Sequence, residues 1–126
     1  MKDFAPYEQA LALKELGFDE PCLGNYFHTK ELKIYGGDIL RIKNSDMGTV
    51  TAPTFSQAFR WFREKYDLHS CVAPVYEDEI SKVIVYWLWI QGFDSFEDED
   101  INYKTPEEAE LNCLLKLIEI VKTKNI

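Results

Sequence analysis

The longest apolar stretch of the chain covers residues 83–90, where eight apolar residues run without interruption between Lys82 and Gln91. Valine, isoleucine and aromatic residues dominate it, so it is predicted to be a β-strand. Side chains alternate across a strand, and here both rows are large and apolar. The pattern therefore predicts a central strand with both faces covered, by helices, by the end of a twisted sheet, or by a second copy of the chain.

Three further stretches carry helical periodicity. The first covers residues 6–16, where Pro6 suits the first helical position and Gly17 suits the left-handed residue after the end. Such an ending places Phe18 back against Leu13. The apolar positions repeat at about 100° per residue, which predicts a helix that packs on another element.

The second helix, residues 54–66, begins with Thr54 and Gln57 at the spacing of a capping box. Its predicted core face is an aromatic stripe at helical spacing, formed by Phe55, Phe59, Phe62 and Tyr66. The third helix begins at Thr105 and Pro106, the strongest helix start in the chain, and continues to about residue 123. Its predicted core face is Leu111, Leu114, Leu117, Ile118 and Val121, widened by Leu115 and Ile120.

The remaining segments favour short strands. Residues 22–28, 32–35 and 38–43 are predicted strands, and Gly36 and Gly37 suit a tight hairpin turn between the last two. Residues 44–48 are predicted to be a turn or mobile loop, and 49–52 to extend the sheet. Residues 70–76 form a fourth strand, where Pro74 indicates an edge or a bulge. The order α-β-β-β-α-β-β-α predicts an α+β fold with a mainly antiparallel sheet of about five strands and three helices.

Composition adds bounds on the class of protein. With 126 residues, 46% of them hydrophobic and 14% aromatic, the chain is predicted to form a single packed domain over 1–126. The start of the chain lacks the pattern of a signal peptide, and no apolar run has the roughly 18 residues of a membrane span. Cys22, Cys71 and Cys113 are few and widely spaced, which favours reduced thiols in the cytoplasm.

The net charge of −8 is concentrated in one segment. Between residues 94 and 110 there are eight acidic residues and one basic residue, which accounts for nearly all of it. The rest is close to neutral, so general nucleic-acid binding, which requires many lysines and arginines against phosphate, is disfavoured. The densest part is the run Glu97, Asp98, Glu99 and Asp100, interpreted first as a solvated loop, with cation binding or DNA mimicry as alternatives.

Three segments, residues 7–22, 52–66 and 103–110, together resemble a family of small proteins carried by phages and prophages of Bacteroides and related gut bacteria. They cover roughly half of the chain, and each also follows general rules for the start of a helix. The resemblance implies a cytoplasmic product of a phage or mobile element. The family has no assigned activity, so it supplies no catalytic residues.

The chain offers few residues for catalysis or metal binding. His28 and His69, with the three cysteines, could supply metal ligands, but no Cys-x-x-Cys pair is present. No strained glycine turn accompanies a cysteine, as a thiol nucleophile would favour. Glu107 and Glu110 are interpreted as favourable charges near a helix start, with an acid–base pair as the alternative. No cofactor is expected, and the catalytic residues, if any exist, are unknown.

The best candidate for recognition lies on the second helix. Trp61 falls outside the aromatic stripe and is surrounded by Arg60, Arg63 and Lys65. Tryptophan and arginine are the residue types most enriched in interface hot spots. The alternative is that Trp61 packs against the flank of the core.

The function predicted from these patterns is that of a non-enzymatic accessory protein that binds an unidentified macromolecular partner. Two alternatives remain open. One is a structural homodimer in which one face of the strand over residues 83–90 is covered by a second copy. The other is a small hydrolase or nuclease that uses His28 or His69 with carboxylates.

Overall fold

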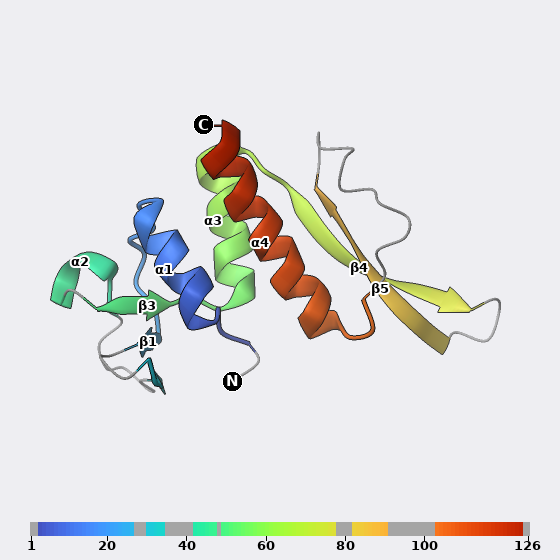
Figure 1. Ribbon diagram of the computed structural model, residues 1–126, viewed down its shortest axis with the longest axis horizontal. Coiled ribbons are helices and arrows are strands. Elements are labelled where there is room, and N and C mark those ends of the chain that lie inside the picture. Colours follow the sequence, from blue (N-terminus) through green and yellow to red (C-terminus); the bar gives the residue numbers. More distant parts are fainter. Residues whose placement is uncertain are drawn as a thin grey trace. The chain divides into compact units, whose positions relative to one another are not determined.

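The computed structural model describes residues 3–26, 30–34, 42–47, 49–77, 82–90 and 103–124. The chain forms two compact units, Met1–Ala58 and Phe59–Ile126, and each is described by itself. The first contains three strands, two helices and the first turn of a third helix. The second contains the rest of that helix, two strands and the last helix (Figure 1). The single domain expected from chain length stays a prediction.

Helix α1, Tyr7–Glu15, ends as the sequence predicts. Gly17 has a φ of 98°, a left-handed conformation that costs glycine little. The amide of Phe18 donates to the carbonyl oxygen of Leu13 at 2.9 Å, and the amide of Gly17 donates to Lys14 at 3.0 Å. This pattern closes the last turn and leaves Phe18 only 1% exposed.

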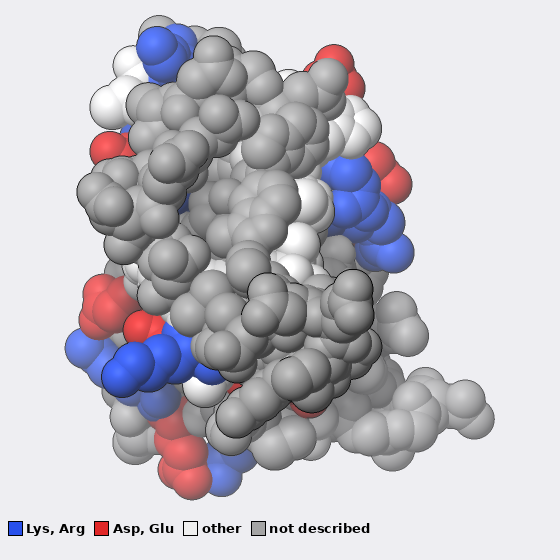
Figure 2. Space-filling model, turned by 90° about the vertical axis from the view of Figure 1, so that its right-hand side faces the viewer, with Lys and Arg blue, Asp and Glu red and all other residues white. Residues whose placement is uncertain are grey.

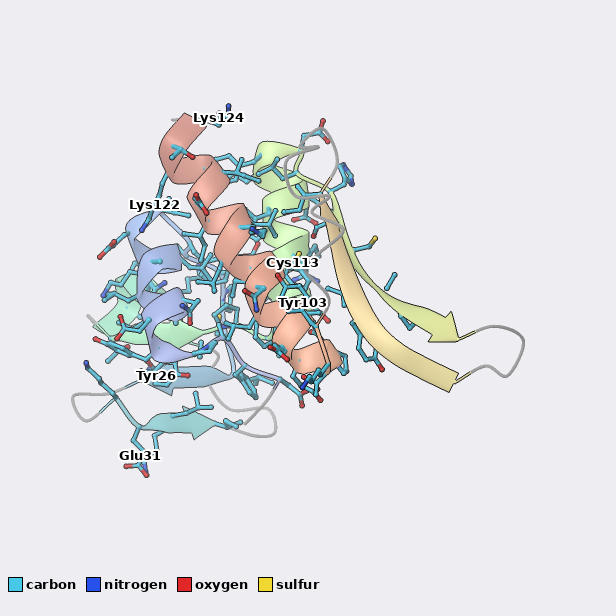
Figure 3. All side chains as sticks on the ribbon, turned by 45° about the vertical axis from the view of Figure 1, so that its right-hand side comes forward. Tyr26, Glu31, Tyr103, Cys113, Lys122 and Lys124 are labelled. Carbon is cyan, nitrogen blue, oxygen red and sulfur yellow. The ribbon has the colours of Figure 1, made fainter. Side chains whose placement is uncertain are left out.

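The first unit holds a three-stranded antiparallel sheet in the order β2-β1-β3. Its strands are β1, Gly24–Tyr26; β2, Leu32–Ile34; and β3, Val50–Ala52. Helix α1 packs on β3. On the face toward α1, the hydroxyl of Tyr26, which is labelled in Figure 3, donates to the carbonyl oxygen of Ala5 at 2.7 Å. The Tyr26 ring meets the Tyr7 ring edge-on. The sheet is thus joined to the segment that begins α1.

A short helix, α2, Asn44–Met47, occupies the segment that was expected to be a turn or mobile loop. The Asn44 side chain fixes its start, since Nδ2 donates to the carbonyl oxygen of Phe18 at 2.7 Å and Oδ1 accepts from the amide of Thr51 at 2.8 Å. The Asp19 carboxylate accepts from the amide of Ser45 at 2.8 Å and from its hydroxyl at 2.9 Å. These partners are distant in sequence, so local patterns gave no sign of the helix.

Helix α3, Phe55–Tyr66, begins where the capping box predicts, but the box is only half formed. The amide of Gln57 donates to Thr54 Oγ1 at 3.2 Å. The Gln57 side chain does not reach back to Thr54; its Nε2 donates to the carbonyl oxygen of Pro21 at 3.0 Å. Gln57 therefore joins the start of α3 to the segment after α1.

The second unit is built on a pair of antiparallel strands, β4, Ser70–Glu77, and β5, Lys82–Ile90. The register shifts between Val75 and Tyr76, where the extra residue, Ile84, lies on β5, whereas Pro74 pairs in register with Tyr86. Helix α4, Pro106–Lys124, packs on both strands. Just before it, Tyr103 pairs with Tyr86 through two backbone hydrogen bonds of 2.7 and 2.9 Å, which fix the entry to α4 beside β5.

The α+β class and the antiparallel pairing are confirmed, whereas the expected sheet of about five strands with three helices is matched only roughly. The described strands form one sheet of three and one of two, and α2 adds a fourth helix. Residues 82–90 are a strand as predicted, but within the described residues β5 pairs along its length with β4 alone and meets Tyr103 only through an isolated bridge. The Gly36–Gly37 hairpin lies outside the described residues, and β2 and β3 both pair with β1.

Candidate interaction surface

Helix α3 carries three exposed basic residues in its last two turns, Arg60, Arg63 and Lys65, which we call the basic surface of α3. Arg60 and Arg63 are three positions apart and therefore neighbours on the outer side of the helix. Arg63 and Lys65 lie near the C-terminal end, where the helix dipole favours positive charge. The only acidic residue of the helix is Glu64, so its side chains carry a net charge of +2.

Trp61 is buried beneath this surface, with 6% of its area exposed. Its ring meets Phe62 and Tyr66 edge-on, with centroids 5.1 and 5.4 Å away. Lys65 Nζ lies 5.1 Å from the centre of the Trp61 ring, within the range of a cation–π contact. The Lys65 side chain thus covers the indole, and the residues of the group that face solvent are the basic ones.

The buried face of α3 is rotated from the predicted aromatic stripe. Phe55, Ala58, Trp61 and Phe62 are buried, whereas Phe59 and Tyr66 are half-buried. Ala58 is 0% exposed, and periodicity of the aromatic residues alone does not reveal that it belongs to the buried face. The shift brings Trp61 into the core and leaves Arg60 and Arg63 outward.

Negative charge accompanies the basic surface at its C-terminal end. Asp67, which has a φ of 55°, follows the helix, and its carboxylate lies 2.9 Å from His69 Nε2. On the face drawn in Figure 2, lysines and arginines of the described part lie beside aspartates and glutamates rather than in one continuous basic area. On α3 itself, the site offered to a partner consists of the positive charges of Arg60, Arg63 and Lys65.

The histidines and possible metal ligands give no constellation for catalysis within the described residues. His69 and Asp67 are paired, but both are exposed, so the pair does not lie in a buried pocket suited to acid–base catalysis. His28 lies outside the described residues. Among those described, no group of three or more His, Cys, Asp or Glu side chains could hold a metal ion.

The three thiols are free, and two of them are buried. Burial raises the pKa of the Cys113 thiol to about 11, against a smaller opposite effect of a hydrogen bond with the Ser70 side chain. Cys71 on β4 is an exposed residue, but neighbouring atoms partly shield its thiol from water, and this desolvation also raises its pKa. Both thiols are therefore protonated at neutral pH, unlike an activated nucleophile. Cys113 is a fully buried core residue of α4 (Figure 3).

Of the acidic residues singled out in the sequence, the structure describes only those at the start of α4. Glu97, Asp98, Glu99 and Asp100 lie outside the described residues. Glu107 is exposed and Glu110 half-buried in the first turns of α4. There the amide of Glu108 donates to Thr105 Oγ1 at 3.1 Å, which confirms Thr105 as the cap.

Comparisons with protein-family models, with curated proteins and with solved structures gave no match to this chain. In the described part of the chain, no helix combines the length and the apolar character needed to cross a membrane. The surface on α3 therefore has to be interpreted from its own chemistry.

Proposed function

We propose that this chain is a non-enzymatic accessory protein of phage or prophage origin, active in the cytoplasm, that binds an acidic site on a protein partner through the basic surface of α3. The observation that carries the proposal is the exposure of Arg60 and Arg63 on a helix whose other side is buried. A helix held by Phe55 and Phe62 presents its arginines on a rigid support, which reduces the entropy lost on binding.

The chemistry of the surface favours a carboxylate-bearing partner. Arginine guanidinium groups bind carboxylates through paired hydrogen bonds, and two arginines one turn apart match two acidic residues one turn apart on a partner helix. Phosphate would also suit arginine, but long nucleic acids require more positive charge than α3 offers, and the whole chain is strongly acidic.

Charge reversal tests this proposal. Tagged wild-type protein, the double variant Arg60→Glu/Arg63→Glu, and the control Lys122→Glu/Lys124→Glu are each purified from host cells, and captured proteins are quantified by mass spectrometry. The control makes the same change in charge on exposed residues of α4. We expect at least one protein to be captured by wild type and control but reduced tenfold or more in the α3 variant. Identical capture by all three proteins would contradict the proposal.

A structural homodimer is the second candidate, favoured by the face of β4 that carries Cys71. Ser70 contacts Cys113 on α4, so Ser70 faces the helix, and alternation turns the neighbouring Cys71 to the other face, where it is exposed. A second copy could cover that face. Sedimentation equilibrium should then show a dimer at micromolar concentration, and a monomer at that concentration rejects this candidate.

A further inference from the structure

The face of the three-stranded sheet that points away from Tyr26 carries polar side chains in its middle. Asn25 on β1 pairs directly with Thr51 on β3, so their side chains lie next to each other on one face. Thr49 precedes Thr51 by two residues and shares its side of the chain. The opposite face carries Tyr26 and is joined to the start of α1.

These polar groups are buried, and the described part of the chain provides no partner for them. Asn25 and Thr51 are both 0% exposed. The oxygen and the nitrogen of the Asn25 amide, and the hydroxyls of Thr49 and Thr51, have no hydrogen bond to any described residue. The nearby Asn44 does not help, because its side chain is already bonded to the amide of Thr51 and the carbonyl oxygen of Phe18.

Leaving such groups unpaired is costly. A buried amide or hydroxyl without a partner loses its bonds to water, and valine or isoleucine would suit both strand positions better. The Asn25 amide offers two N–H donors and an oxygen acceptor, and the Thr51 hydroxyl beside it offers a donor and an acceptor. Internal water molecules in proteins typically make about three hydrogen bonds to groups of this kind.

We infer that Asn25, Thr49 and Thr51 form an internal binding site for water, with at least one long-lived molecule bridging the Asn25 amide and the Thr51 hydroxyl. The site does not depend on the proposed function, because it lies in the first unit and α3 presents its basic surface in the second. Water fits better than a charged ligand, because all three side chains are neutral. Each of them can both donate and accept a hydrogen bond, as a water molecule can.

Magnetic relaxation dispersion of water oxygen-17 measures the number of internal waters with long residence times. Wild type is compared with Asn25→Leu/Thr51→Val, which removes the polar groups at similar volume, and with the control Thr123→Val, which alters an exposed threonine of α4. In the double variant, we expect the dispersion amplitude to fall by the contribution of at least one water molecule. In the control, the amplitude should stay unchanged.

A high-resolution crystal structure of wild type provides the second measurement, which holds even if the double variant fails to fold. Electron density for a water within hydrogen-bond distance of both Asn25 and Thr51 supports the inference. A direct hydrogen bond between the two side chains, with no water at the pair, would overturn it. Density for a co-purified organic molecule at this position, confirmed by native mass spectrometry, would also overturn the inference. The site would then hold that molecule and not water.

Discussion

Tyr26 donates its hydroxyl to the carbonyl oxygen of Ala5 at 2.7 Å, a bond that connects β1 to the residue just before α1. The tyrosine is buried, so this carbonyl depends on the hydroxyl for its partner in the described part of the chain. Replacement of Tyr26 by phenylalanine keeps the ring contact with Tyr7 and removes only the bond.

We expect Tyr26→Phe to lower the free energy of unfolding by about 1–3 kcal/mol, the usual cost of leaving a buried polar group unpaired. Urea denaturation followed by tryptophan fluorescence measures it. Tyr7→Phe is the matched control, because it removes a hydroxyl from the other ring of the same contact. Equal stability of Tyr26→Phe and wild type would show that the bond contributes nothing.

Gly24 is packed too closely for any side chain. A Cβ atom placed there would lie 2.9 Å from the carbonyl oxygen of Ala52 and 2.9 Å from Phe4 Cδ1. One of these neighbours is backbone, so β1 and β3 would have to separate. We expect Gly24→Ala to destabilise the protein by about 1–3 kcal/mol, the range for overpacked cores, in thermal or urea unfolding. Ser56→Ala, at an exposed position of α3, should change stability little.

The raised pKa of Cys113 predicts a loss of stability at alkaline pH. The folded protein holds the thiol proton up to about pH 11, whereas the ordinary value is 9.0. The folded state therefore binds more protons between these values, and this contribution is complete below pH 9 and lost as the pH rises through 11. The loss is at most about 2–3 kcal/mol.

The unfolding free energy should accordingly fall less steeply above pH 9 in Cys113→Ala than in wild type, whatever the difference between them at pH 7. Urea titrations at pH 7, 9 and 10 measure the two slopes. Parallel slopes would mean that this thiol does not titrate differently in the folded and unfolded states.

Asp19 acts as a remote cap for α2. The backbone amide of Ser45, and then its hydroxyl, stabilise the carboxylate and lower the pKa of Asp19 below 3.8. A lowered pKa contributes stability above pH 4 that is lost as the solution becomes more acidic. Carbon-13 NMR of the carboxyl group should show a pKa below 3.8 in wild type and a higher one in Ser45→Ala, which keeps only the amide donor. An unchanged pKa would mean that the hydroxyl bond is absent.

The Thr105 cap should contribute to the stability of α4. Its hydroxyl accepts from the amide of Glu108, and its loss in Thr105→Ala should cost about 1 kcal/mol. Thr123→Ala, at the exposed C-terminal end of the same helix, is the control and should cost less. Denaturant midpoints of both variants compare the two ends directly.

The features predicted best are those that depend on neighbours in the sequence. The end of α1 at Gly17 and the start of α4 at Thr105 were both recognisable because the groups that hydrogen-bond lie within a few residues of one another. The same holds for the strand over residues 82–90, whose composition favours β-structure in any surroundings.

Features that depend on distant partners could not be derived. The helix at Asn44 exists because its side chain bonds Phe18 and Thr51, and Gln57 turns to Pro21 instead of completing its own capping box. The division into two sheets also depends on contacts between distant residues, because the residue pattern of a strand does not identify the strand with which it pairs. The sequence identified the basic residues of α3. It did not predict that Lys65 covers Trp61, because that contact depends on side-chain geometry.

The pairing of β4 with β5 has a consequence for the order of folding. These strands are close in sequence, with Glu77 opposite Lys82, whereas β1 must find β3 across α2 and the chain between. Short loops close with less loss of entropy, so the hairpin of the second unit should form earlier than the sheet of the first. Pulsed hydrogen exchange during refolding should therefore protect the amides of Cys71 and Trp89, which face each other across β4 and β5, before those of Gly24 and Ala52, which face each other across β1 and β3.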